Sequence, residues 1–343
     1  MTMVDESPAM IRARRARIGA VYREVQTWFT TEALVETLAI GDSETEAIAL
    51  EWLAKAGKRF RPFLVASLHL ALRDEDLSAP VAEDVRLLAV ALECIHKGSL
   101  IYDDIQDGDA CRYGDATVHS VHGMPVALTA ALLLLGWGYR LIGRCHCPPD
   151  CVAEMLTLAY QAHCDLCLGQ GGELCWMRAP KALLPEEVLD LFRLKTAPSF
   201  DVVFRLPLIY HRRRDLDDMM QRFSITVGTA YQVQDDLHDF HGNGDVDDIA
   251  ARRPSIVMAY AHQMTTGSVH QQVAEGWFGD RLLPRSEWRQ IIADCGAVAA
   301  AEAALTGLKD EARTILSSCD NPLLRDLLVQ VMETILGVDD PGA

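Results

Sequence analysis

The stretch LIYDDIQDGDACRYGD, residues 100–115, places three aspartates directly after an apolar run. A second stretch, YQVQDDLHDF at 231–240, repeats the same Asp-Asp-x-x-Asp spacing beside Tyr231 and Val233. Residues four apart on an α-helix share a face, so the first and last aspartates of each motif present their carboxylates together. Like charges at that spacing destabilise an isolated helix. Each motif therefore needs a compensating positive charge.

The residues next to these aspartates supply no permanently positive side chain; they include Ile101, Tyr102, Ile105, Leu237 and His238. Mg²⁺ binds oxygen ligands, typically one or two carboxylates, and completes its shell with water and substrate phosphate. One such motif alone would be weak, because charge runs are usually a solvated helix face. Two copies predict two carboxylate clusters that hold a diphosphate through metal ions.

The rest of the chain has the periodicity of helices. Apolar residues recur every three or four positions, as in Leu64-Leu68-Leu72, and period-two runs rich in β-branched residues are scarce. The breaks are short, with none long enough for a linker, and fall at 74–80, 147–149, 178–186 and 241–245. We predict an all-α protein with a single domain over residues 1–343, in which 120–145 and 151–177 are long helices.

Charge and hydropathy exclude several classes of partner. The formal net charge is −17, which argues against nucleic acids and anionic membrane surfaces, since both are bound through clustered positive charge. The N-terminal 20 residues lack the apolar core of a secretory signal, and the longest apolar run, 126–137, is too short to span a bilayer. We expect a cytoplasmic protein without an integral membrane segment, in which 126–137 is a buried helix.

Ten cysteines in such a protein predict reduced thiols packed in helices and not a disulfide framework. Six of them gather in one region, together with His146, and zinc is the alternative there: Cys145, Cys147, Cys151, Cys164, Cys167 and Cys175. None of their spacings matches an accepted zinc-ligand pattern, and Cys164 and Cys167 fall on a helical face where small apolar residues pack well. We therefore expect structural thiols.

A diphosphate also needs direct cationic donors, and GKRFRP at 57–62 concentrates Lys58, Arg59 and Arg61 at the start of a helical pattern. The alternative is a basic helix start on the surface. Further candidates are Arg112 and the pair Lys195-Thr196. His96 lies seven residues before Asp103, two helical turns away on about the same face, although a histidine packed in the core is the alternative.

These motifs, in this order, resemble the trans-isoprenyl diphosphate synthases of the polyprenyl synthetase family. The resemblance is strongest over 50–260 and rests on GKRFRP, HKGSLIYDDIQD at 96–107, the following Arg112, GQGGE at 169–173 with Gln170, KTAPSF at 195–200 and YQVQDDLHD at 231–239. The resemblance implies an all-α, single-domain bundle of the isoprenoid synthase type. It also implies a central apolar cavity with both aspartate motifs at its mouth, and a homodimer.

The resemblance further implies the chemistry. About three Mg²⁺ ions would bind an allylic diphosphate through Asp103, Asp104, Asp107, Asp235 and Asp239, and Lys195 and Arg112 would complete the clamp. Isopentenyl diphosphate would be held by Lys58, Arg59, Arg61 and His96, and its double bond would attack the allylic cation formed when the C–O bond ionises. Thr196 and Gln232 would be polar groups near the metals or the cation. The aspartates would then border apolar residues because hydrocarbon tails lie below the polar heads.

Four positions depart from the family pattern. Tyr113 stands where a second arginine normally helps hold isopentenyl diphosphate, and Glu173 replaces an aspartate. Arg253 stands where a lysine is common, and the segment 240–253 is short and lacks a further lysine. These departures keep two alternatives open: a class I terpene cyclase, and a non-catalytic subunit of a heteromeric synthase. GKRFRP favours condensation, since a cyclase has no second diphosphate to bind.

The length of the product should depend on the residue five positions before the first aspartate, about 7.5 Å below it on the helix. That residue is Gly98, and Cys94 lies one turn further down. Neither is a bulky aromatic, so we predict a C20 or C25 product. Replacing Gly98 with Phe should shorten it.

Overall fold

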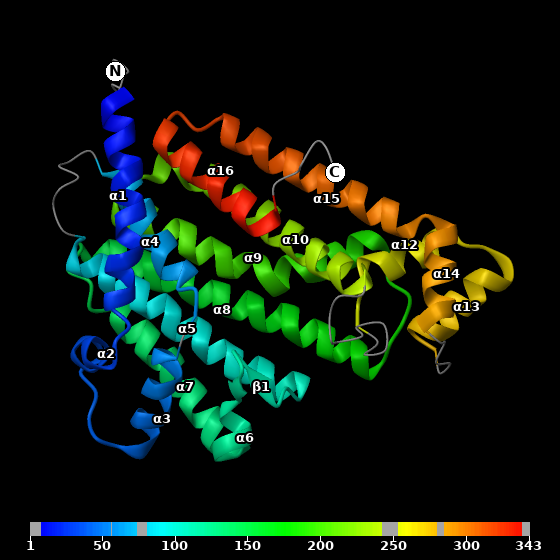
Figure 1. The fold of residues 1–343 in the computed structure, drawn as a ribbon, viewed down its shortest axis with the longest axis horizontal. Coiled ribbons are helices and arrows are strands. Elements are labelled where there is room, and N and C mark those ends of the chain that lie inside the picture. The colour runs from blue at the N-terminus through cyan, green and yellow to red at the C-terminus, as the bar shows by residue number, and fades with distance from the viewer. Residues whose placement is uncertain (1–7, 56, 74–80, 242–252, 280–284, 338–343) are drawn as a thin grey trace. The chain divides into compact units, whose positions relative to one another are not determined.

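The chain is almost entirely helical in the computed structural model, which confirms the all-α prediction (Figure 1). The structure describes residues 8–337 except for 56, 74–80, 242–252 and 280–284. The shortened segment 240–253 and the break at 74–80 therefore lie largely or wholly outside the described residues. The helices are α1 Pro8–Thr27, α2 Thr31–Leu38, α3 Glu44–Ala54, α4 Phe60–Leu72, α5 Glu83–Asp107, α6 Val118–His122, α7 Met124–Ile142, α8 Pro149–Arg178, α9 Pro185–Tyr210, the 3₁₀ helix η1 Arg214–Leu216, α10 Asp217–His241, α12 Ile256–Met264, α13 Gly267–Trp277, α14 Arg285–Cys295, α15 Ala297–Ser317 and α16 Pro322–Leu336.

The contacts divide the chain into two compact units. Unit 1 comprises Met1–Tyr160, Val203–Asp217 and Asn321–Leu327, and unit 2 comprises Gln161–Val202, Asp218–Asp320 and Leu328–Ala343. The first aspartate motif belongs to unit 1 and the second to unit 2.

Helix α5 is the centre of unit 1, where it packs against α4 and α7. Its apolar positions, among them Leu87, Leu88, Ala91 and Leu92, are buried, as the three- and four-residue spacing predicts. The helix ends after the first aspartate motif because Gly108 adopts a left-handed conformation (φ 72°) and its N–H donates to the Asp104 carbonyl oxygen. The motif therefore occupies the last turn of α5.

A two-stranded hairpin follows, with β1 (Cys111–Arg112) antiparallel to β2 (Asp115–Ala116). The residues between the strands, Tyr113 and Gly114, both have positive φ, at 58° and 83°. That backbone is the one a two-residue turn needs to match the twist of the strands. The hairpin brings Arg112 back toward the end of α5.

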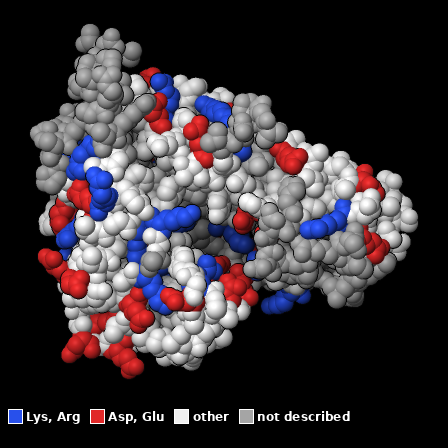
Figure 2. Space-filling model, viewed as in Figure 1, with Lys and Arg blue, Asp and Glu red and all other residues white. Residues whose placement is uncertain are grey.

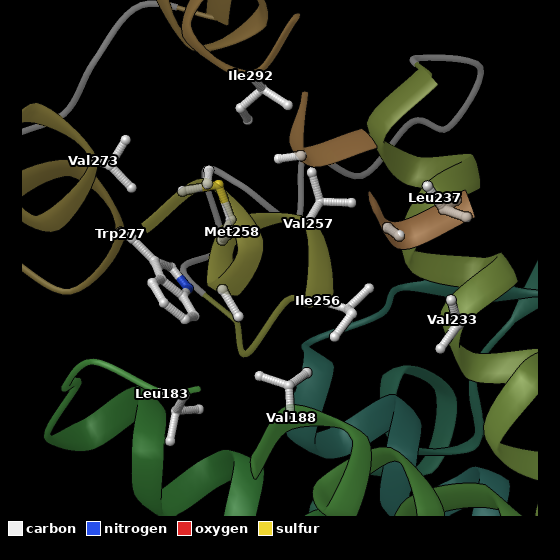
Figure 3. Packing of buried hydrophobic residues seen from close by; sticks show 14 of the residues in the cluster. Leu183, Val188, Val233, Leu237, Ile256, Val257, Met258, Val273, Trp277 and Ile292 are labelled. Atoms are coloured by element: carbon white, nitrogen blue, oxygen red, sulfur yellow. The ribbon is translucent and has the colours of Figure 1, made fainter. Parts of the chain in front are cut away.

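Unit 2 has its own core, built around α12 (Figure 3). Helix α12 contacts α13, α14 and α15, and α10 adds Val233 and Leu237 to the same apolar cluster. These two residues flank Asp235 and Asp236 in the sequence. The apolar neighbours of the second motif are therefore core residues of unit 2.

The two long helices predicted around Cys147-Pro148-Pro149 are present as α7 and α8. One described helix, α7, is long and apolar enough to cross a membrane, and the bent pair formed by α14 and α15 passes the same length and composition test. Helix α7 packs on α3, α5 and α6 within unit 1. Its burial is incomplete, because Leu132 is 61% exposed.

All ten cysteines are described, and each is a free thiol. Cys94, Cys145, Cys151 and Cys319 are buried, as structural thiols should be. Cys167 is exposed, so the expectation that it packs against apolar neighbours is wrong. On the molecular face shown in Figure 2, the described acidic and basic side chains are interspersed.

Candidate active site

The first aspartate motif lies at the carboxyl end of α5, where the helix dipole adds partial negative charge to three carboxylates. Arg112 of the hairpin balances part of that charge. Its Nη2 lies 3.0 Å from Asp103 Oδ2 and 3.4 Å from Asp109 Oδ2, and its Nε bonds to Asp104 Oδ1. The cation that this motif was predicted to need is supplied within unit 1 by a guanidinium.

Asp104 is the buried member of the motif, at 0% exposure. Burial raises the pKa of its carboxyl, and the Arg112 guanidinium offsets part of that rise. Its second oxygen, Oδ2, is buried and accepts no hydrogen bond from the described residues. A carboxylate oxygen left without a partner beside two further carboxylates suits a hard divalent cation.

The donor set of the first motif thus fits Mg²⁺ in chemistry. In the described part of the chain, however, no three His, Cys, Asp or Glu side chains already converge on a metal position. Arg112 contacts one oxygen of Asp103 and one oxygen of Asp104. Oδ2 of Asp104 would therefore be available to a metal while Arg112 stays in place.

Arg61 and His96 come together as the sequence suggested. Arg61 Nη1 lies 3.1 Å from His96 Nε2, and a guanidinium can only donate, so Nε2 accepts and the ring proton is assigned to Nδ1. Burial, and then the charge of Arg61, hold the pKa of His96 well below its ordinary value. His96 is therefore neutral at pH 7. Lys58 is exposed on the loop that precedes Arg61.

Arg59 does not lie where a substrate-binding residue should, and the structure corrects that expectation. Its side chain is only 2% exposed and pairs with Glu93 Oε1 at 2.7 Å. Its Nη2 donates to three carbonyl oxygens at the end of α3, those of Leu53, Ala54 and Lys55. The guanidinium thus faces the protein, so Arg59 holds the GKRFRP loop in place. Its positive φ of 48° is held by the same network.

Gly98 does not border an open cavity in the described structure, contrary to expectation. A Cβ atom built there would lie 3.1 Å from the Ala131 carbonyl oxygen and 3.3 Å from Leu134 Cβ, both on α7. Gly98 thus permits the close approach of α5 and α7. A phenylalanine would push on α7 before it could shorten a product.

Two further residues, neither of them among the predicted site residues, complete the unit 1 cluster. Lys97 is fully buried, and Tyr113 lies with its ring centroid 4.3 Å from the Lys97 ammonium. A sequence signal for Lys97 was available, because a lysine directly after His96 interrupts a helix that is otherwise apolar at this level.

In unit 2, the second motif lies near the end of α10. Asp235 is exposed and Asp239 is half-buried. Asp236 has a structural role, because its Oδ2 accepts hydrogen bonds from Ser255 Oγ at 3.0 Å and from the Ile256 N–H at 2.8 Å. It thereby caps the amino end of α12, where backbone N–H groups otherwise lack partners. The middle aspartate of the second motif is thus committed to the fold.

Lys195 of α9 is paired with Glu173 of α8. The Nζ atom lies 2.9 Å from Oε1 and 2.8 Å from Oε2, and Glu173 is buried. Arg253 Nη1 lies 3.9 Å from the same carboxylate. The departure at Glu173 therefore keeps its charge and uses its length to reach both cations.

Close helix packing positions Lys195. A Cβ on Gly169 of α8 would lie 2.4 Å from the Lys195 backbone nitrogen, so only glycine allows α8 and α9 to approach this closely. Gly228 of α10 is in the same situation, 2.4 Å from Ala197 Cα. Gln170 is half-buried beside Gly169.

Thr196 and Gln232 contact each other, with Thr196 Oγ1 donating to Gln232 Oε1 at 2.7 Å. This contact joins α9 to α10 one turn before Asp235 and Asp236. A small pocket lies beside the end of α10 in unit 2; it is lined by Asp236, Asp239, Phe240, Arg253, Ser255, Met258 and Trp277.

Comparison with known proteins identifies the family of this chain. Residues 43–291 match the polyprenyl synthetase family model. The chain is 24% identical over 297 residues to a geranylgeranyl pyrophosphate synthase of Geoglobus acetivorans, covering 85% of this chain and 90% of that protein. It is 28% identical over 257 residues to a geranylfarnesyl diphosphate synthase of Natronomonas pharaonis, covering 71% and 72%.

Among solved structures, the fold is similar to a geranylgeranyl pyrophosphate synthase of Corynebacterium glutamicum complexed with isoprenyl diphosphate and magnesium. The TM-score is 0.77 at 21% identity, with 94% of this chain and 98% of that one covered. That likeness concerns the fold. The family match over most of the length, together with the two aspartate motifs and their cations, shows that this chain belongs to the polyprenyl synthetase family of prenyltransferases.

Proposed function

We propose that this prenyltransferase condenses isopentenyl diphosphate with an allylic diphosphate to give a trans-polyprenyl diphosphate of C20 or C25. The observation that carries the proposal is a cationic group separate from the aspartates. Arg61, neutral His96 and the exposed Lys58 form this group on α4, α5 and the loop before α4. A cyclase needs no such group, because it binds one diphosphate only.

The aspartates and the remaining cations serve the allylic substrate in this proposal. Asp103, Asp104 and Asp107 of unit 1 and Asp235 and Asp239 of unit 2 would hold about three Mg²⁺ ions, whose charge stabilises the departing diphosphate. Two further cations, Arg112 and Lys195, would bind the diphosphate. Each is partly accessible, although each is also paired with carboxylates.

Several residues would act on the protein and not on the substrate. Arg59 keeps the GKRFRP loop closed on Glu93, and Asp236 keeps α12 attached to the second motif. Gln232 holds Thr196 toward α10. Arg253 lies near Glu173, so it can pair with that carboxylate when Lys195 binds a diphosphate. Only some of the charged residues near the two motifs would therefore contact a substrate.

The names of the relatives support the chain length, since they include a geranylgeranyl and a geranylfarnesyl diphosphate synthase. The exposed apolar residues of unit 1, Leu132, Val121 and Met124, support a homodimer that buries them, and the family supports a cytoplasmic location. Light scattering of the purified protein tests the dimer.

Product analysis tests the reaction. Purified protein is incubated with Mg²⁺, isopentenyl diphosphate and, in separate tubes, C5, C10, C15 or C20 allylic diphosphates, and all products are identified by mass. Extension in C5 steps that stops at C20 or C25 is the expected result. A hydrocarbon or alcohol formed without isopentenyl diphosphate would make the protein a cyclase, and activity only after a partner is added would make it a subunit.

A further inference from the structure

Lys97 of α5 is a buried lysine without a carboxylate partner among the described residues. It is 0% exposed, and its ammonium makes one long hydrogen bond, 3.4 Å, to the Lys55 carbonyl oxygen. The buried carboxylate of Glu93, whose charge acts on Lys97, is paired with Arg59. Two aromatic rings contact the ammonium instead, with centroids 4.9 Å away for Trp52 and 4.3 Å away for Tyr113.

This arrangement costs stability. Burial, and then the nearby positive charge of Arg59, lower the pKa of Lys97 to about 8, although Glu93 opposes the shift. Cation–π contacts with Trp52 and Tyr113 offset only part of the hydration free energy that a buried ammonium loses. A methionine would fill the same space without that loss. The charge is therefore not explained by packing.

The position of Lys97 connects it with the cationic group that we assign to isopentenyl diphosphate. A Cβ on Gly57, the first residue of GKRFRP, would lie 4.0 Å from the Lys97 ammonium. His96 precedes Lys97 on α5, and the lysine charge contributes to the lowered pKa of that ring. Lys97 thus lies close to the loop that carries Lys58 and leads into α4, where Arg61 lies.

The Tyr113 ring lies over the Lys97 ammonium. Tyr113 occupies the tip of the hairpin with a φ of 58°, and it is 50% exposed although its ring lies on a buried ammonium. One side of the ring therefore faces Lys97 while the rest is open to a ligand. Burial raises the pKa of the Tyr113 hydroxyl, so this group stays protonated and can donate, and an anion bound there gains from both groups in a low-dielectric setting.

We propose that Lys97 and Tyr113 together bind the diphosphate of isopentenyl diphosphate: Tyr113 donates a hydrogen bond from its hydroxyl, and Lys97 supplies the positive charge from behind the ring. This inference rests on the proposed function and names a further pair of residues for its second substrate. Lys97 is a positioning residue here, because it acts through Tyr113. The pair would replace the arginine that the family pattern has at residue 113.

The test compares substrate affinities in single and paired variants. Lys97→Met should raise KM for isopentenyl diphosphate about tenfold, with kcat and the allylic KM within about twofold. Tyr113→Phe should give a smaller rise, because the Lys97 charge stays, and the double variant should bind isopentenyl diphosphate more weakly than either single variant. Tyr113→Arg in the Lys97→Met background should restore the affinity, since it brings cation and donor together.

A matched control removes a neighbouring lysine. Lys55 also lies near Trp52, with its ammonium 5.8 Å from the ring centroid, but it pairs with Asp115 at 3.6 Å. Lys55→Met should change KM for isopentenyl diphosphate by less than about twofold. A purely structural Lys97 would instead lower the melting temperature when replaced and would weaken both substrates alike. Either of those results, or an unchanged KM in Lys97→Met, overturns the inference.

Calorimetric titration of isopentenyl diphosphate into wild type and Lys97→Met separates this inference from the proposed function, because binding needs no turnover. Elongation by wild type with equal affinities in both proteins would refute the role of Lys97 alone. Tenfold weaker binding in Lys97→Met without elongation in wild type would refute the condensation and keep the binding pair. No binding to wild type would refute both.

Discussion

The two aspartate motifs have one spacing and two kinds of support. In unit 1 the motif closes α5 and is held by charge, because Arg112 pairs with Asp103 and Asp104. In unit 2 the motif lies on α10 beside an apolar core that includes Val233 and Leu237, and Asp236 caps α12. Ion pairs thus hold the first cluster, whereas helix packing and a cap hold the second. The two motifs have the same spacing, but their middle aspartates have different roles: Asp104 pairs with Arg112 and Asp236 caps α12.

The largest effect should come from the buried ion pair behind the unit 1 cluster. Arg59→Met should lower the free energy of unfolding by about 3–5 kcal/mol, because it leaves Glu93 buried without its partner. Urea denaturation measures this. The double variant Arg59→Met with Glu93→Leu should recover part of the loss. If the single variant is as stable as wild type, charge does not hold this loop and the comparison fails.

A substitution at Asp103 tests whether the first motif binds metal or only pairs with Arg112. Asp103→Asn should reduce kcat/KM by about 10²–10³-fold, because a metal-binding carboxylate is lost where diphosphate charge develops. Asp109→Asn is the control, since Asp109 also contacts Arg112, at 3.4 Å, but lies outside the motif. Steady-state assays at saturating Mg²⁺ measure both. Equal losses in the two variants would mean that pairing with Arg112 is all that matters.

Helix packing in unit 2 is probed by two glycines of GQGGE. Gly169→Ala should cost about 1–3 kcal/mol of stability, because its Cβ would overlap the Lys195 backbone at 2.4 Å. Gly171 has nothing within 4 Å of its Cβ position, so Gly171→Ala should be neutral or stabilising. Thermal unfolding measures both. If Gly169→Ala unfolds at the same temperature as wild type, close helix packing does not support the second motif.

The cap in unit 2 predicts a smaller loss. Asp236→Ala should lower the free energy of unfolding by about 1–2 kcal/mol, since the Ser255 hydroxyl and the Ile256 N–H lose their acceptor. Asp236→Asn keeps an acceptor oxygen and should lose less. Denaturation at several urea concentrations distinguishes them. Asp104→Asn, the equivalent change in unit 1, should not weaken α12, so a common stability effect would contradict the difference between the motifs.

The smallest effect concerns pH. The unfolded chain keeps the Lys97 proton up to about 10.5, but the folded protein releases it near 8, so the unfolded state binds more protons between these values. The free energy of unfolding of wild type should therefore rise relative to Lys97→Met by about 1 kcal/mol between pH 8 and 9. Stability curves of the two proteins that run parallel over this range would exclude a buried, titrating ammonium.

Sequence reasoning predicted the helices and the positions of both aspartate motifs along the chain. Helical periodicity and i, i+4 spacing are local properties, so they can be read without a structure. The same reasoning misplaced Arg59 and Gly98, because the surroundings of each depend on which helix packs opposite. It did not weigh Lys97, whose burial depends on α3 and the hairpin.

By itself, the sequence determined the all-α class, the paired aspartate motifs and the family, because each is encoded in spacing along one helix or in the order of short motifs. The tertiary structure alone decided which charges are available to a substrate. Arg59 and Asp236 are bound to carbonyls and a helix end, while Lys97 is buried under Tyr113. Burial and hydrogen-bond partners come from residues distant in the chain, and they determine whether a charge binds substrate or holds the fold.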